Sequence, residues 1–358
     1  MKKLDLYIIK KFLGTFFFAI ILIITIVIIF DISEKVDDFI QKQAPLKAII
    51  FDYYLNFIPY FVNLFSPLFT FISVVFFTAK LASNTEIIAI LASGISFRRL
   101  LRPYIYSSLI LAVMSFYLSN FVIPPANRKR LEFENTYINS KARCTEKNIH
   151  KQIRPGTFIY LESFNSSSNT GYKFTIEKIK EGKLSYKLAA DFINWDSIKC
   201  KWQINNYKIR RINGMIESMT SGNRLDTTIN LTPYEFIRKK NNIETMNYAE
   251  LNKFIAEERL KGSENIEFYL VEKHKRIAFP FATLVLTLIG VSLSSRKVRG
   301  GIGMHIGTGL TISFSFILFM QVSTTFATNG NLSPFISVWI PNLIFGALGI
   351  YLLRTAPK

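Results

Sequence analysis

Between Arg299 and Arg354 the chain reads GGIGMHIGTGLTISFSFILFMQVSTTFATNGNLSPFISVWIPNLIFGALGIYLL, residues 300–353, a stretch of 54 residues without a formal charge. A helix needs about 20 apolar residues to cross the hydrocarbon layer of a bilayer, so this stretch is too long for one crossing and suits two. The polar residues 327–333, ATNGNLS, predict a turn near its middle. The chain is therefore expected to end in a helical hairpin within a membrane.

Four more uncharged runs have the length of a membrane span. They are residues 12–30, 53–79, 103–127 and 277–295. Lipid cannot satisfy open backbone groups, so each run must be a helix or part of a closed barrel, and continuous apolar runs lack the alternation of a barrel strand. The sequence therefore predicts an α-helical integral membrane protein with six transmembrane helices, three before and three after a long hydrophilic segment.

The basic residues beside these spans predict the orientation of the chain. They are Lys2, Lys3, Lys10 and Lys11 before the first span, Lys80, Arg98, Arg99 and Arg102 in the second loop, Arg296, Lys297 and Arg299 in the fourth, and Arg354 and Lys358 in the tail. Short loops rich in lysine and arginine stay in the cytoplasm. Both termini are therefore expected there, and a loop at residues 31–52 and the large segment 128–276 are expected on the opposite side.

The large segment has the composition of a soluble domain. We predict three parts of the chain, residues 1–127 and 266–358 in the membrane and residues 128–265 as an inserted all-β domain. Runs at 157–162, 172–177, 184–195 and 201–209 predict strands, whose spacing suggests a sandwich or jelly roll. A helix is expected at 248–261, ended by Gly262.

Charge and cysteine content add little about chemistry. The net charge is +19, and residues 128–276 hold 28 basic and 18 acidic residues. This excess suits either an anionic partner, such as a phosphorylated lipid head group, or an ordinary solvated basic surface. Cys144 and Cys200 both lie in the inserted domain, where a disulfide is one option.

The sequence contains no familiar catalytic motif. Nucleotide-binding GxxxxGK[ST], GxSxG, CxxC and HExxH patterns are all missing. His150, His274 and His305 are isolated in sequence, which is typical of packing or surface residues, and Gly303 and Gly307 form a small-xxx-small pair that predicts close helix packing. A membrane enzyme would have to use the carboxylates near the first span, which otherwise form a solvated loop or an interhelical contact. These are Asp31, Glu34, Asp37 and Asp38.

The second loop contains a short helix with signals at both ends. Ser83 and Glu86 match a capping box, and Gly94 is a stop signal. An isolated helix of about ten residues is marginal in water, so this one needs a surface to pack on. Its apolar face is Ile87, Ile88, Leu91 and Ile95. Two partners are possible, the nucleotide-binding subunit of a transporter or the lipid surface.

The same loop resembles a known family. Residues 83–96, SNTEIIAILASGIS, are similar to the coupling-helix signature of the lipopolysaccharide-export permeases LptF and LptG. Shorter similarities follow in the family's order along the whole chain. They are YIIKK at 7–11, Val36-Asp37, Ile123-Pro124, LTP at 231–233 and WIPNLIF at 339–345. The Val36-Asp37 region and the short tail after the last span favour LptG.

The resemblance implies a non-enzymatic permease subunit of an ATP-driven ABC exporter in the bacterial inner membrane. Such a subunit extracts lipopolysaccharide and passes it through a periplasmic jelly-roll domain to a bridge toward the outer membrane. Its implied partners are an LptB-like ATPase dimer, a second LptF/LptG-type permease and an LptC-like periplasmic protein, with no nucleic acid. ATP and Mg²⁺ are used by the ATPase, and this chain is expected to bind no cofactor. The alternative is a permease-like scaffold or receptor that presents a periplasmic binding domain.

The resemblance also implies roles for particular residues. The ATPase contact falls on Glu86, Ile87, Ile88, Leu91, Ala92, Ser93 and Gly94, although Glu86 also has a local role in capping. Head-group phosphates are expected at Lys35, Arg128, Lys129 and Arg130, whose alternative is to mark helix ends at the interface. The lipid cavity is expected at Phe16, Ile20, Ile24, Val27, Phe314, Leu318 and Val322, whose alternative is bundle core or bilayer contact.

Overall fold

The computed structural model describes two compact units. Its described residues are 3–138, 147–166, 168–197, 199–229, 232–233, 240–260, 262–263, 265–295, 301–330 and 332–355. The helical unit comprises Met1–Phe133, Glu244–Tyr248 and Glu267–Lys358, and the second unit comprises Glu134–Ile243 and Ala249–Ile266. Helix α6 (Ile123–Tyr137) thus continues beyond the expected domain boundary at residue 127, because the polar residues after Pro125 are compatible with a helix.

The predicted six membrane spans are confirmed. Among the described residues, six helical stretches are long and apolar enough to cross a bilayer, namely Lys3–Gln41, Leu46–Ser83, Phe97–Tyr137, Ile266–Ser294, Gly303–Thr328 and Pro334–Thr355. Their elements are α1 (Lys3–Gln41), α2 (Leu46–Ala48), the π-helical η1 (Ile49–Tyr54), α3 (Leu55–Ser83), α5 (Phe97–Tyr117), the π-helical η2 (Leu118–Val122), α6 (Ile123–Tyr137), α9 (Ile266–Ser294), α10 (Gly301–Thr328) and α11 (Pro334–Thr355). The short α4 (Glu86–Ala92) lies between α3 and α5.

The expected loop at residues 31–52 is mostly helical, which corrects that prediction. Helix α1 continues to Gln41, and α2 begins at Leu46 after a short turn that includes Pro45. Charged residues do not break a helix, and Asp31 and Lys35 form a pair at i,i+4 with a 2.6 Å separation that supports one. Charge marks where a span leaves the lipid, but it does not mark where the helix stops.

Two of the apolar clusters through which the helices pack meet at α3. Helix α1 contacts α3 and α5, whereas α10 contacts α3 and α11. Between α10 and α11, Ser323 Oγ donates a hydrogen bond to the Ser337 carbonyl at 2.6 Å. Gly309 rather than the predicted pair Gly303 and Gly307 packs closely, because a Cβ there would lie 3.3 Å from Phe71, while the other two face open space.

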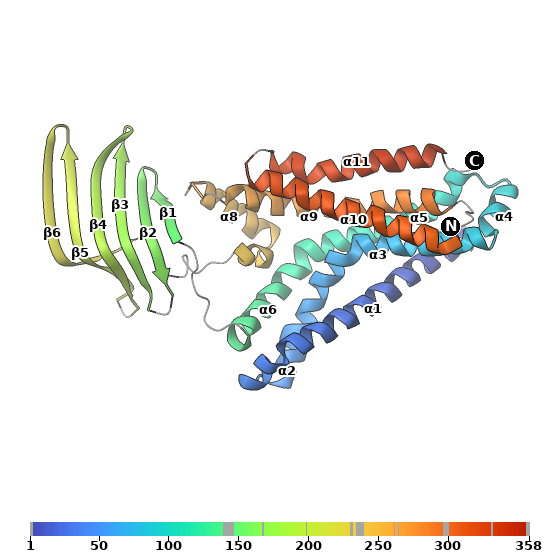
Figure 1. Cartoon of the computed structure of the whole chain (residues 1–358), viewed down its shortest axis with the longest axis horizontal. Helices are drawn as coiled ribbons and strands as arrows, with labels where there is room; N and C mark the ends of the chain where they lie inside the picture. The colour runs from blue at the N-terminus through green and yellow to red at the C-terminus, as the bar shows by residue number, and fades with distance from the viewer. Residues whose placement is uncertain are drawn as a thin grey trace. The chain divides into compact units, whose positions relative to one another are not determined.

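The last two spans form the hairpin that the uncharged stretch predicts. Helix α10 ends at Thr328, α11 begins at Pro334, and Gly330 adopts a φ of +87° in the turn between them. Figure 1 places the N-terminus and the C-terminus at the same end of the helical unit, beside α4. An even number of spans requires this arrangement.

The inserted all-β domain is confirmed as one six-stranded antiparallel sheet. Its strands are β1 (Lys147–Arg154), β2 (Thr157–Asn165), β3 (Thr170–Lys180), β4 (Lys183–Asp196), β5 (Lys201–Asn213) and β6 (Ile216–Thr227). The strand order is β1-β2-β3-β4-β5-β6, so each strand pairs with its neighbour in sequence (Figure 1). Tight turns at Gly156, Gly182 and Gly214, all with positive φ, join β1 to β2, β3 to β4 and β5 to β6. In the part of the domain that the structure describes, the connections are those of a meander and not of the expected jelly roll.

The two outermost strands were missed by the sequence analysis for a physical reason. Strand β6 is largely exposed along its length, and β1 reads KNIHKQIR, so neither shows a clear apolar alternation. The four predicted strands supply most of the buried core, which includes Leu161, Phe174 and the fully buried Trp202. Helix α8 (Tyr248–Leu260) follows, and Gly262 with a φ of +64° lies just after it, as predicted.

Candidate functional site

Helix α4 begins differently from the prediction. Ser83 is the last residue of α3, and Thr85 in the left-handed region precedes Glu86, the first residue of α4. The expected capping box is therefore wrong, because α3 continues through the residue that would have been the cap. The Glu86 carboxylate instead accepts a hydrogen bond from Asn84 Nδ2 at 3.2 Å. The predicted stop is confirmed by Gly94, which follows the C-cap Ser93 with a φ of +84°.

The expected apolar face of α4 is divided between the bundle and the surface. Ile87 is 1% exposed and belongs to the core cluster, with Leu91 half-buried against it. Ile88 is 54% exposed, and Ala92, Ser93 and Gly94 are exposed as well. The inner face attaches α4 to the unit, so the outer face is what a partner could contact.

Lys35 lies in a polar network at the other end of α1. Its ammonium donates to Asp31 Oδ1 at 2.6 Å and to the Tyr53 hydroxyl, and it lies 4.9 Å from the centre of the Tyr53 ring. Tyr54 donates from its hydroxyl to the second oxygen of Asp31 at 3.1 Å. Lys35 is thus tied to α1 and η1, and its side chain is only 20% exposed.

The basic run on α6 splits into an outer and an inner part. Arg128 and Lys129 are exposed, and Arg128 Nη2 donates to the Thr245 carbonyl at 3.4 Å. Arg130 is half-buried, with its guanidinium carbon 5.2 Å from the centre of the Tyr60 ring on α3. Of the three, Arg128 and Lys129 are therefore better placed to meet a ligand from solution or from the membrane surface.

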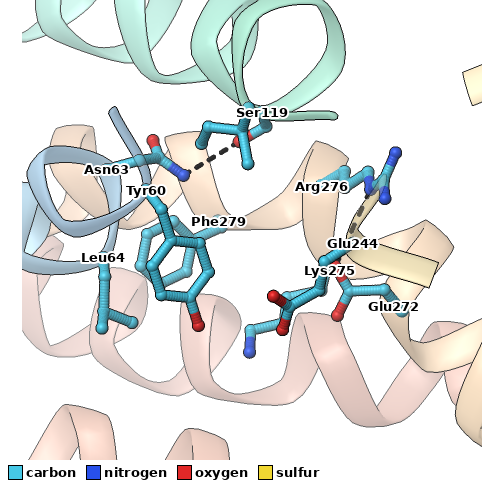
Figure 2. A pocket seen from close by; sticks show the side chains of 10 residues that line it. Tyr60, Asn63, Leu64, Ser119, Glu244, Glu272, Lys275, Arg276 and Phe279 are labelled. Carbon is cyan, nitrogen blue, oxygen red and sulfur yellow. Dashed lines mark hydrogen bonds and ion pairs between the residues drawn. The ribbon is translucent and has the colours of Figure 1, made fainter. Parts of the chain in front are cut away.

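Beside Arg130 the helical unit contains a charged pocket with a cavity of about 90 Å³. Helices α3 and α9, η2, the start of α6 and Glu244 line it. Its lining residues are Tyr60, Asn63, Leu64, Ser119, Ile123, Glu244, Glu272, Lys275, Arg276 and Phe279 (Figure 2). Asn63 Nδ2 donates to Ser119 Oγ at 3.0 Å on the uncharged side of the pocket.

Arg276 is the most buried charge in this pocket. The residue is 5% exposed, its Nη1 donates to the Met246 carbonyl at 2.7 Å, and its Nε lies 3.7 Å from Glu272. Asn127 Nδ2 contacts both the carbonyl and the carboxylate of Glu244 at 3.5 Å. Side chains of α6 and α9 therefore hold the chain where it returns from the inserted domain.

Glu244 titrates abnormally in these surroundings. Burial raises the pKa of the Glu244 carboxyl above its ordinary value, and the neighbouring carboxylate of Glu272 raises it further. The cations Arg130, Lys275 and Arg276 lower the same pKa without reversing the shift. A carboxyl that is buried beside another carboxylate retains its proton to a higher pH than a solvated one.

The predicted cavity residues occupy two different environments. Phe16, Ile20 and Ile24 are buried in the core cluster with residues of α3 and α5, which is the bundle-core alternative, and Val27 is half-buried. On α10, the three predicted residues are exposed on its apolar surface. These are Phe314, Leu318 and Val322. Of the seven predicted cavity residues, only the three on α10 lie on an open apolar surface.

The remaining candidates are not among the residues described for α4 or for the charged pocket. His150 stacks near Tyr160 in the sheet, His274 lies 5.5 Å from the Phe335 ring, and His305 is buried in α10. Cys200 is a free, exposed thiol, and Cys144 lies outside the described residues, as do Arg296, Lys297 and Arg299. Glu34, Asp37 and Asp38 lie on α1 with Asp31, so they are helical residues rather than a loop.

Sequence reasoning did not select the charged pocket. The charges of Glu244, Glu272 and Arg276 contribute to the net charge of residues 128–276, and Arg276 lies directly before the uncharged run 277–295. The available signal was the dense run Glu272-Lys-His-Lys-Arg276 directly before the apolar run 277–295. Charges at this position must be solvated, paired or functional.

Six apolar helices with a β domain between the third and the fourth define a multi-pass membrane protein of the permease type. The family described as lipopolysaccharide export system permease LptF/LptG matches residues 6–355. The chain belongs to this family, and the resemblance found in its motifs is confirmed. A relative from Rickettsia prowazekii (strain Madrid E), "Uncharacterized protein RP871", is 23% identical over 309 residues, covering 82% of this chain and 79% of the relative. The chain is thus a lipopolysaccharide-export permease of the inner membrane.

Proposed function

We propose that the chain is one half of an ATP-driven exporter that extracts lipopolysaccharide from the inner membrane and passes it to a periplasmic bridge. The observation that carries this proposal is α4, a short helix whose inner residue Ile87 anchors it and whose outer residue Ile88 is exposed. Figure 1 shows α4 at the end of the helical unit where both termini lie. A surface of this kind suits a soluble nucleotide-binding subunit.

The orientation follows from the distribution of basic residues. Lys80, Arg98 and Arg102 flank α4, and Lys10 and Lys11 lie near the start of α1, so this end belongs in the cytoplasm. Both termini are then cytoplasmic, and the inserted sheet is periplasmic. The partners are an LptB-like ATPase dimer that uses ATP and Mg²⁺, a second LptF/LptG-type permease and an LptC-like periplasmic protein.

Extraction needs an external source of free energy. Each methylene that leaves an apolar environment is worth about 0.8 kcal/mol, and lipid A carries several acyl chains. Exposed apolar side chains of α10, such as Phe314 and Leu318, would face those chains in the assembled permease. ATP hydrolysis in the partner subunit would supply the energy, and α4 would transmit the movement.

The head-group phosphates require cations at the periplasmic end. Arg128 and Lys129 are exposed on α6, just beyond the third predicted span, and Lys35 lies just beyond the first. Because Lys35 is already paired with Asp31, Arg128 and Lys129 are the stronger candidates for a phosphate contact. The net positive charge of the segment 128–276 supports an anionic ligand on this side.

The experiment reverses one charge on α4. Glu86→Lys places a cation at the start of the helix, where it opposes the helix dipole and faces the proposed ATPase contact. We expect the protein to remain inserted, while capture of the ATPase and ATP-dependent release of lipopolysaccharide are lost. The matched control is Glu257→Lys, the same reversal at an exposed position of α8.

Two results would contradict the proposal at different levels. Unchanged ATPase capture and unchanged lipid release in the Glu86→Lys variant would remove α4 from the coupling contact. If the wild-type complex with its nucleotide-binding partner showed no lipid-stimulated hydrolysis, the exporter function would be wrong, and the scaffold or receptor alternative would be favoured.

A further inference from the structure

The start of α1 is joined to the start of α5 by a two-armed ion pair. Arg99 Nη1 and Nη2 donate to the two carboxylate oxygens of Asp5 at 2.8 and 2.7 Å. Asp5 is 4% exposed, and the side chain of Arg99 is 28% exposed. The flat guanidinium matches a carboxylate in one orientation, so this pair specifies geometry as well as charge.

Arg99 is closely connected to α4 along the chain. The C-cap of α4 is Ser93, and α5 begins at Phe97 with Ser96 as its N-cap. The backbone N–H of Arg99 donates to Ser96 Oγ at 3.4 Å, which ties Arg99 to the linker itself. Because the linker between the two helices is short and capped, α4 can move little unless the start of α5 moves with it.

Apolar packing joins the same three elements behind the ion pair. Ile8 and Phe12 of α1, Ile87 of α4, and Phe97 and Leu100 of α5 are buried members of one core cluster. Apolar contacts of this kind tolerate sliding, because lipid and side chains are similarly apolar and neither strongly prefers one register. A bidentate ion pair does not tolerate sliding, since a shift would break both hydrogen bonds between the Arg99 guanidinium and the buried Asp5 carboxylate.

We propose that Asp5 and Arg99 are positioning residues that pass a displacement of α4 directly to α1. This inference rests on the proposed function, because it takes α4 as the ATPase contact. Helix α1 has 39 residues, so as a continuous helix it is about 60 Å long. A displacement that enters at Asp5 therefore reaches the far end of α1, where Lys35 and Asp31 lie.

The test uses the whole complex with its ATPase in vesicles that contain lipopolysaccharide. Hydrolysis of ATP and lipid release are measured in parallel for wild type, Asp5→Asn, Arg99→Gln and the exchanged pair Asp5→Arg with Arg99→Asp. We expect Asp5→Asn and Arg99→Gln to hydrolyse ATP at near the wild-type rate. Lipid released per ATP should fall by about fivefold or more, a size that directly paired residues show in double-mutant cycles.

Two further variants separate positioning from simple stabilisation. The exchanged pair should restore most of the lipid released per ATP that the single variants lose, because it restores one ion pair at the same place. Arg98→Gln removes an adjacent exposed cation and should leave the ratio unchanged. Arg99→Lys keeps the charge without the two-armed geometry and should give an intermediate ratio.

Three outcomes would overturn the inference. They are an unchanged ratio in both single variants, no recovery in the exchanged pair, or a parallel loss of hydrolysis, release and thermal stability, which indicates a structural role alone. If the wild-type complex released no lipid with ATP, the proposed function itself would fail, and the inference with it.

Discussion

Arg276→Met should release the segment Glu244–Tyr248 from the helical unit without unfolding that unit. Methionine keeps the length and the apolar stem of the side chain but removes the guanidinium. In the wild type that group is 5% exposed, donates to the Met246 carbonyl at 2.7 Å and lies 3.7 Å from Glu272. The segment retains its contacts with Asn127 and Arg128, so it is weakened rather than detached.

The size of the effect follows from these contacts. A hydrogen bond from a charged donor contributes about 1.5–3 kcal/mol. The ion pair with Glu272 joins two residues of α9, so it does not hold the segment and adds nothing to this effect. Removing a buried charge also removes its desolvation penalty, which offsets part of the loss. The net weakening is about 2 kcal/mol, or roughly 30-fold in the equilibrium for local opening.

Hydrogen exchange measured by mass spectrometry reads this opening directly. Peptides that cover residues 244–248 should exchange roughly 30-fold faster in the Arg276→Met variant when local opening limits exchange. Peptides from α3 and α10 should keep their wild-type rates. The control is Arg102→Met, the same chemical change at an exposed position of α5. If residues 244–248 were equally protected in wild type and variant, the argument that Arg276 holds this segment would be refuted.

Three further predictions concern Glu244, the basic residues of α6 and the apolar face of α4. Because the pKa of Glu244 is raised, docking of its segment should be strongest below the ordinary glutamate pKa of 4.5 and weaken as pH rises through the raised value. Glu244→Gln should abolish this dependence in hydrogen exchange corrected for intrinsic rates, and an unchanged dependence would assign it to another group. Replacing Arg128 and Lys129 by Gln should reduce photocrosslinking to lipopolysaccharide, and undiminished crosslinking would remove both from the head-group site. Ile87→Ala should lower stability by about 2–4 kcal/mol, whereas the exposed Ile88→Ala should change it by less than about 0.5 kcal/mol while weakening ATPase capture. Thermal unfolding of the purified protein checks the stability difference, and equal shifts would contradict it.

The membrane part of the fold was predictable because lipid imposes a strict rule on the sequence. Four uncharged runs of single-span length and one of double length became six spans, and the polar break after residue 326 became the turn at Gly330. The ends of the helices were less predictable. Residues 31–41 continue α1, because a charged segment can remain helical where it extends from its own membrane span. Likewise, α3 continues to Ser83, beyond the end of the uncharged run at residue 79.

The two candidate regions differ in how visible they were from sequence. The α4 residues and Arg128 to Arg130 lie next to span ends, where local patterns identify them. Glu244 and Arg276 are brought together with Asn127, which is 117 positions from Glu244, by tertiary packing across an inserted domain. No local pattern encodes that proximity, and each charge alone is consistent with a solvated surface.

Helix α1 is held at each end by a polar contact and along its middle by apolar ones. Arg99 of α5 binds Asp5 at the α4 end, and Tyr54 of η1 binds Asp31 at the other. Between them, residues such as Phe16 pack in the apolar core. Within a bilayer, apolar packing selects neighbours but sets the register of two helices weakly, so the polar contacts at the ends specify the position of α1 along its axis. The two contacts belong to different neighbours, α5 and η1. A movement of α4 that carries α5 therefore pulls α1 against its second anchor, and the Asp31 network becomes the place where the movement must be absorbed or transmitted.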